Sequence, residues 1–280
     1  MNENLVTGPD TEEGDVIDTL NGFTGSAASV VDGSPFSVIY GSPLYRDLDS
    51  GELILNDFGF PQLDPTGATP DRVLGDPNPD WRAGLGTTIE YKNFRLSAQF
   101  DAVQGNDVWN GTRGVLNHFG VSQETANEVT VSAAEAITIV NYQGTAIQDL
   151  PNAQQNDDGS YTVRGNLEDF GAGTVLLDQA YYNGATGSGF NGATEPYIED
   201  ASYVKLRELT LGYSFSNQAA KSIGMRSLDI SISGRNLITW SDIEGFDPDN
   251  NLTGASKGRG LEYFTNPSTS SYSFIVRIGL

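Results

Sequence analysis

The sequence predicts an all-β fold in which antiparallel strands form the wall of a transmembrane β-barrel. Three observations support this prediction. Apolar and polar residues alternate with the period of two that a strand imposes, short turns alternate with long polar loops, and no run approaches the ~20 apolar residues of a membrane helix. The strands are expected near residues 84–91, 94–102, 206–215, 227–240 and 272–280.

The first two strands are expected to form a hairpin. Only two residues, Lys92 and Asn93, separate them, which is a common length for a hairpin turn. The positions on one face are Leu85, Thr87, Ile89 and Tyr91 in the first strand and Phe94, Leu96, Ala98, Phe100 and Ala102 in the second. The opposite face of each strand is polar or carries glycine.

The three remaining strands repeat this pattern. Their apolar faces consist of Leu209, Leu211, Tyr213 and Phe215; Leu228, Ile230 and Ile232; and Tyr272, Phe274, Val276, Ile278 and Leu280. The opposite faces carry charges that are expected to form a cross-strand ladder on the barrel wall. The members of this ladder are Arg95, Asp101, Glu208, Asp229, Arg235 and Arg277.

Two environments can produce such alternation. A soluble antiparallel sheet has one face on a core and one in water, whereas a transmembrane barrel has lipid outside and a wet lumen inside. Aromatic residues at the strand ends favour the barrel, because aromatic girdles lie at membrane interfaces. These residues are Tyr91, Phe94, Tyr213, Phe215 and Trp240.

The connections predict which end of each strand lies on the periplasmic side of the membrane. Outer-membrane barrels have short periplasmic turns and long extracellular loops. The turns at 92–93 and 216–227 are therefore expected in the periplasm together with the C-terminus, and the segments 41–80, 103–202 and 241–270 outside the cell. Within the longest loop, scattered apolar residues predict a short helix between Ser122 and Val140.

Composition excludes several classes of function. The net charge of −22 speaks against nucleic acid as a partner, since phosphate would be repelled. With no cysteine and a single histidine, His118, no nucleophile–base pair can be assembled, so we expect neither an enzyme nor a cofactor.

One acidic motif has the spacing of a calcium-binding loop. Asp247, Asp249 and Asn251 stand at positions i, i+2 and i+4, but Leu252 occupies the position where an EF-hand has glycine. A proline-containing turn is the preferred interpretation, and no metal site is predicted.

The segments SYVKLRELTLGY (202–213) and SGRNLITWSDIEGFDPD (233–249) resemble the SusC/RagA-like TonB-linked outer-membrane transporters of Bacteroidetes. This resemblance extends over roughly residues 30–280. It implies a barrel of ~22 strands with an N-terminal plug, energised through TonB. Such a transporter imports oligosaccharides or peptides together with a surface lipoprotein of the SusD type that closes over it as a lid.

The beginning of the chain departs from that family pattern. Residues 1–15 have neither the basic leader nor the apolar core of a signal peptide, and nothing resembles a plug or a TonB box. Five or six strands cannot close such a barrel, so the whole chain, 1–280, is expected to be the C-terminal part of a larger protein.

Exposed aromatic side chains beside amides predict where a sugar or peptide would bind. The candidate residues are Trp109, Asn110, Tyr181, Tyr182, Asn183 and Phe190. The alternative is that these aromatic residues pack the loop itself. Two other functions also remain open at this point, namely a soluble or surface β-sandwich that binds glycans or adheres, and a passive porin-like channel.

Overall fold

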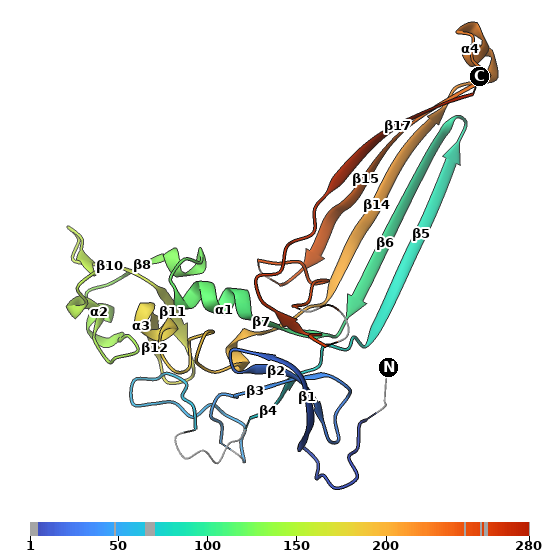
Figure 1. The fold of residues 1–280 in the computed structure, drawn as a ribbon. Coiled ribbons are helices and arrows are strands. Elements are labelled where there is room, and N and C mark those ends of the chain that lie inside the picture. The colour runs from blue at the N-terminus through green and yellow to red at the C-terminus, as the bar shows by residue number, and fades with distance from the viewer. Residues whose placement is uncertain are drawn as a thin grey trace.

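A computed structural model describes residues 5–47, 49–64, 71–243, 245–252, 254 and 257–279. The described chain has two parts, which Figure 1 shows one beside the other. One part is a long sheet of five strands, and the carboxyl terminus lies at one end of this sheet. Several small sheets and short helices gather at its other end. The all-β, antiparallel fold class is thus confirmed.

The five segments expected as strands form this long sheet. They are β5 (Trp81–Tyr91), β6 (Phe94–Gln104), β14 (Tyr203–Ser214), β15 (Ser227–Ser241) and β17 (Ser271–Gly279). Their order is β17-β15-β14-β6-β5, and every neighbouring pair is antiparallel. Three of the strands, β5, β6 and β14, extend two or three residues beyond one of their expected ends, whereas the ends of β15 and β17 differ from expectation by at most one residue.

The register places the apolar residues of all five strands on one face. Leu96 stands opposite both Ile89 and Leu211, and Leu211 in turn stands opposite Ile232, which faces Phe274. Large side chains on this face remain exposed, including Leu85 at 64% and Phe274 at 66%. No second sheet of the described residues covers this face (Figure 1), so the arrangement of a β-sandwich is not found here.

A β-bulge in β14 interrupts the alternation. Leu206 pairs with Phe100 and Glu208 pairs with Gln99, so Arg207 is the extra residue. A bulge of this kind re-aims the side chain at its position. Arg207 and Glu208 therefore share the polar face of the sheet, where strict alternation would have put them on opposite faces.

The end of the sheet that holds the carboxyl terminus has short connections. The turn between β5 and β6 has Lys92 at φ 54°, a left-handed conformation typical of two-residue hairpin turns. Between β14 and β15 lies the helix α4 (Asn217–Ser222), whose N-terminus is capped by the Ser216 hydroxyl, which accepts from Ala219 N. Figure 1 shows both connections at the same end.

Four strands that precede the long sheet were not expected from the sequence. They are β1 (Val16–Phe23), β2 (Ser26–Val31), β3 (Val38–Gly41) and β4 (Arg72–Gly75), and they form an antiparallel sheet in chain order. β4 lies within the segment 41–80 that was expected to be loop. With only four residues, it is too short to show a period of two.

Residues 105–202, which we call the loop subdomain, contain a series of short elements. Its strands are β7 (Asp107–Asn110), β8 (Glu128–Val131), β9 (Gln154–Gln155), β10 (Tyr161–Arg164), β11 (Asn166–Asp169), β12 (Thr174–Leu177) and β13 (Ile198–Asp200). Its helices are α1 (Gly111–His118), η1 (Glu124–Ala126), α2 (Glu135–Thr138), η2 (Ile147–Asp149), α3 (Gln179–Tyr182) and η3 (Glu195–Tyr197). One further strand, β16 (Leu261–Glu262), joins β7 in parallel from outside the subdomain.

The helix predicted between Ser122 and Val140 is wrong. That stretch instead contains η1, the strand β8 and the single turn α2. The run Val129-Thr130-Val131 explains the difference, because β-branched residues favour strands and β10 offers a partner strand.

The loop subdomain has one hydrophobic core of its own and shares two others with neighbouring segments. One contains Val131, Ala136, Ile139, Ile147, Leu150, Val163 and Leu176. A second contains Phe60, Val175, Tyr181 and Tyr182, and a third joins Trp109 and Tyr197 to Ala28, Ile39 and Leu261. Among the described residues, no helix combines the length and the apolar content that a membrane crossing requires.

Candidate functional site: a polar cavity in the loop subdomain

A cavity with a volume of about 690 Å³ lies inside the loop subdomain. Four glutamine and asparagine side chains line it without a hydrogen-bonding partner in the described structure: Gln143, Asn152, Gln154 and Gln179. Each amide offers donors and acceptors side by side. The cavity therefore presents free hydrogen-bonding groups of both kinds to a ligand.

The charged groups of the cavity wall are mostly engaged within the protein. Arg164 donates from Nε to the Thr125 carbonyl at 2.6 Å and from Nη2 to the Gly120 carbonyl at 3.1 Å. Asp178 accepts from Asn141 at 2.8 Å and caps the N-terminus of α3. Since Arg164 and Asp178 already form hydrogen bonds within the protein, the groups left for a ligand are mainly neutral amides.

An aromatic side chain also borders the cavity. Phe119 lines it and is 60% exposed, and its ring lies 6.0 Å from that of Phe190. His118 lies between them and forms a 2.9 Å hydrogen bond with Ser188. An exposed ring beside free amides can bind the apolar face of a ligand while the amides bind its polar groups.

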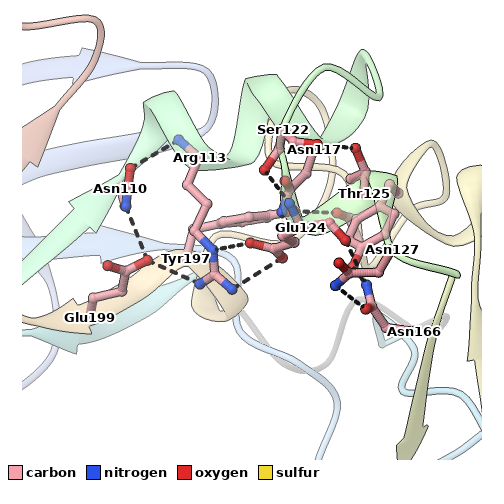
Figure 2. Close-up of polar contacts among 12 residues, drawn as sticks. Asn110, Arg113, Asn117, Ser122, Glu124, Thr125, Asn127, Asn166, Tyr197 and Glu199 are labelled. Atoms are coloured by element: carbon pink, nitrogen blue, oxygen red, sulfur yellow. Dashed lines mark hydrogen bonds and ion pairs between the residues drawn. The ribbon is translucent and has the colours of Figure 1, made fainter. Parts of the chain in front are cut away.

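A partly buried ion network around Arg113 supports one wall of the cavity (Figure 2). The Arg113 guanidinium binds Glu124 through Nε at 2.8 Å and Nη2 at 3.2 Å, and Glu199 through Nη1 at 3.0 Å. Burial lowers the pKa of Arg113, but the two glutamates outweigh this effect and raise it. The guanidinium therefore stays charged and holds η1 against α1 and β13.

Asparagine side chains extend this network toward the cavity. Asn110 accepts from Arg113 N at 2.9 Å, which caps α1, and donates to Glu199 at 3.1 Å. Asn117, a wall residue of the cavity, donates to Glu124 at 2.8 Å. The charge pairs thus fix the positions of the side chains that shape the site.

The six residues predicted to bind substrate fall into two groups. Trp109, Asn110 and Tyr181 are 1%, 1% and 8% exposed and pack the interior, as the alternative interpretation expects. The Trp109 ring stacks on Tyr263 at a centroid distance of 6.3 Å. Burial raises the pKa of Tyr181, so its phenol stays neutral.

The other three predicted residues lie nearer to a ligand. Tyr182 is buried but lines the cavity, Phe190 is 40% exposed, and Asn183 is exposed. Substrate binding by these residues stays a prediction. The free amides of the cavity were missed, although the amide-rich run from Asn152 to Asn156 was a visible signal for two of them.

The acidic motif near residue 250 forms a turn, in which Asn250 N donates to the Asp247 carbonyl at 2.9 Å. Its carboxylates bind Lys205, so they are neutralised by a side chain. Within the described part of the chain, no group of three histidine or acidic side chains could hold a metal ion. Of the charge ladder, Glu208 pairs with Arg235 at 3.0 Å, whereas Asp101 pairs with Arg207, a residue outside the predicted set.

Comparison with known proteins identifies relatives of this chain, although no family model matches it. The TonB-dependent receptor P3 of Formosa agariphila is 26% identical over 240 residues, which are 83% of this chain and 18% of that protein. The TonB-dependent receptor P26 of the same organism is 27% identical over 203 residues, covering 70% of this chain and 17% of that protein. The chain thus spans less than a fifth of the length of either relative.

Among solved structures, the RagAB peptide transporter has a similar fold. Its TM-score is 0.52 at 15% sequence identity, and the match covers 91% of this chain and 24% of that chain. At this identity, the match supports the antiparallel fold alone.

The chain is therefore similar in sequence to TonB-dependent receptors, and its antiparallel strands with an uncovered apolar face agree with that similarity. Because both relatives are TonB-dependent receptors, the resemblance of its sequence motifs to TonB-linked transporters is confirmed. These relatives are receptors and not enzymes, which also agrees with the expectation that the chain is not an enzyme.

Proposed function

We propose that the chain supplies a segment of barrel wall and its outer loops to a TonB-dependent importer of nutrients in the outer membrane. The observation that carries this proposal is the apolar face that runs across all five strands and is left uncovered. Lipid is the environment that makes such a face favourable. The proposed whole is a multi-pass barrel of ~22 strands, to which β5 and β17 would be joined by further strands, because unpaired backbone groups are costly in lipid.

The arrangement of the connections supports an orientation for this segment. The hairpin turn, α4 and the carboxyl terminus share one end of the sheet, and the loop subdomain lies at the other (Figure 1). We assign the first end to the periplasm. The segments 41–80, 103–202 and 241–270 would then be extracellular.

The cavity of the loop subdomain is the proposed point of contact with substrate. Its free amides suit hydroxyl groups or peptide groups, so an oligosaccharide or a peptide is the proposed cargo. A SusD-like lipoprotein would close over the loops as a lid. TonB would act through the plug of the complete receptor.

Uptake measurements in cells with and without TonB test this proposal. Import by the complete receptor should cease when TonB is deleted, while binding of substrate at the cell surface should remain. The passive porin alternative predicts undiminished uptake in the same cells, and that result would refute the proposal.

A deletion tests whether the loop subdomain carries the function. Gly105 N donates to the Ser202 hydroxyl at 2.9 Å, so the two ends of the subdomain meet. Removing residues 106–201 and joining these ends with two glycines should leave the sheet intact, since loop length contributes little to closure entropy. We expect assembly without uptake or lipoprotein binding; normal uptake by this variant would move the substrate site elsewhere.

A further inference from the structure

The connection between β15 and β17 contacts both parts of the molecule. We call its described residues between 242 and 270 the strap. At one end the strap meets the polar face of the sheet, and further along it meets the loop subdomain. The subdomain also meets the sheet at two backbone crossings, Gly105–Asn106 and Ala201–Ser202, which are linked by a 2.7 Å hydrogen bond from Ala201 N to the Asn106 carbonyl. The segment before β5 is a further connection, because Asp107 N donates to the Asp76 carbonyl at 2.8 Å.

A cluster of ion pairs attaches the strap to the sheet. Lys205 of β14 is 2% exposed, and its ammonium group binds Asp247 and, at 2.8 Å, Asp249. Arg207 binds Asp249 through Nη2 at 2.6 Å and Asp101 of β6 through Nε at 2.7 Å. These five residues form what we call the ion cluster.

Hydroxyl groups complete the ion cluster. The Tyr203 hydroxyl donates to Asp249, and the Ser268 hydroxyl donates to Asp247. The Lys205 ammonium also lies 4.9 Å from the centre of the Tyr203 ring. Asp247 and Asp249 are therefore each bound by a cation and a hydroxyl at once, so both of these charges are compensated.

Different contacts attach the strap to the loop subdomain. Leu261 of β16 is fully buried and pairs with Trp109 of β7, and Tyr263 stacks on the same tryptophan. Glu262 is 1% exposed and accepts from Thr112 Oγ1 at 2.9 Å and from Thr112 N at 3.3 Å. The strap is thereby part of the subdomain's own packing.

We propose that Lys205 and Arg207 are positioning residues that lock the strap to the sheet and so hold the loop subdomain at one angle to it. The physical reason is the cost of an unpaired buried charge. A buried ion pair contributes little net stability, but loss of one partner leaves a charge without compensation and is strongly unfavourable. The charges of the ion cluster are therefore compensated only when the strap lies against the sheet in this one position. The inference concerns the geometry of the two parts and does not depend on import.

Distance measurements between spin labels test this inference. The chain has no cysteine, so cysteines introduced at Gln218 of α4 and Asp157 of the loop subdomain would provide two exposed labels in the assembled receptor. The wild-type cluster should give a narrow distance distribution. Lys205→Met or Arg207→Met should broaden it, whereas Arg95→Met, which removes an exposed arginine from the same face, should leave it unchanged.

A charge exchange separates positioning from simple loss of folding. Lys205→Asp combined with Asp247→Lys restores an opposite pair and should narrow the distribution again. Trypsin provides a second readout, because cleavage after Lys257 in the strap should become about tenfold faster or more in Lys205→Met if local opening limits cleavage. If Lys205→Met fails to assemble, Asp249→Asn should show the same broadening. Wild-type distances and cleavage rates in these variants would overturn the proposal.

Discussion

The long sheet exposes many of its apolar side chains, whereas the loop subdomain buries its own. In the subdomain Ile147 and Leu176 are fully buried, whereas on the sheet Leu85 and Phe274 are about two-thirds exposed. The difference shows that the subdomain carries its own interior, while the sheet requires an apolar environment outside itself.

The edges of the sheet lead to the same conclusion. β5 pairs only with β6, and β17 pairs only with β15, among the strands that the structure describes. Each edge strand therefore leaves a row of backbone donors and acceptors open. The small sheets of the subdomain are shorter, and their strands pack on hydrophobic clusters.

The largest stability effect is expected in the subdomain interior. Ile147→Ala should destabilise it by about 2–5 kcal/mol, because the substitution leaves a cavity where no surface is exposed. The matched variant is Ile232→Ala on the sheet, where the side chain is 56% exposed. Chemical unfolding of both variants in detergent should show the larger loss of unfolding free energy for Ile147→Ala. Equal losses would mean that the two regions do not differ in how they bury apolar side chains.

Charge on the apolar face should impair assembly in the membrane. Arginine in place of Ile230 or Phe274 is expected to cost about 2–4 kcal/mol if these side chains face lipid. Ser231→Arg places the same charge on the polar face and serves as the control. The measurement is the amount of receptor in the outer membrane. If the variants at Ile230 and Phe274 reached normal amounts and Ser231→Arg did not, the polar face and not the apolar face would be the one that contacts lipid.

A smaller effect is expected from the cavity amides. Gln154→Ala or Gln179→Ala should each weaken substrate binding by about 0.5–1.5 kcal/mol, the usual contribution of one hydrogen bond. Gln123→Ala removes an exposed amide outside the cavity and should have no effect. The affinity of each variant is measured by titrating the complete receptor with its cargo. Unchanged affinity in both cavity variants would mean that the ligand does not enter this cavity.

The smallest effect near neutral pH concerns the strap. Burial raises the pKa of Asp247 and Asp249, but hydrogen bonds from Lys205 and from Ser268 or Tyr203 more than offset this, so both pKa values lie below the ordinary 3.8. A carboxyl group with a depressed pKa in the folded state stabilises the fold above its unfolded pKa and loses that contribution as pH falls through the folded value.

Attachment of the strap should therefore be constant from pH 7 down to about 4 and weaken only below that range. Tryptic cleavage is unsuited to acid, so the spin-label distances are the appropriate measurement. A broadening of the distribution between pH 5 and 7 would contradict the depressed pKa values.

The sequence predicted the sheet well because its signal repeats. Five long strands with one apolar face each are visible from residue order alone, and the turn at Lys92-Asn93 joins the first two. The bulge at Arg207 was missed, although the consecutive charged residues Arg207 and Glu208 break the alternation of β14. The strands β3 and β4 were missed because each has only four residues, and β1 was missed because its eight residues do not alternate in polarity. The strand β8 was taken as helix because its few apolar residues fit both periods.

The candidate site was predicted less well than the fold. Trp109 and Tyr181 were chosen for their chemistry, but burial depends on contacts with Tyr263 and Phe60, which lie far away in sequence. The ion cluster was likewise invisible, because Lys205 and Asp247 are separated by the whole of β15. Local patterns identify strands, whereas a site depends on which distant segments meet.

The Lys205 ammonium group has a consequence for how this surface responds to its surroundings. The motif Asp247-Pro248-Asp249 closes around a cation that is covalently carried by the neighbouring strand. A loop that recruits dissolved calcium loosens whenever the ion is scarce or chelated. Here the counter-ion is encoded in the chain, so the strap should stay fastened in water of any hardness and should be indifferent to chelators.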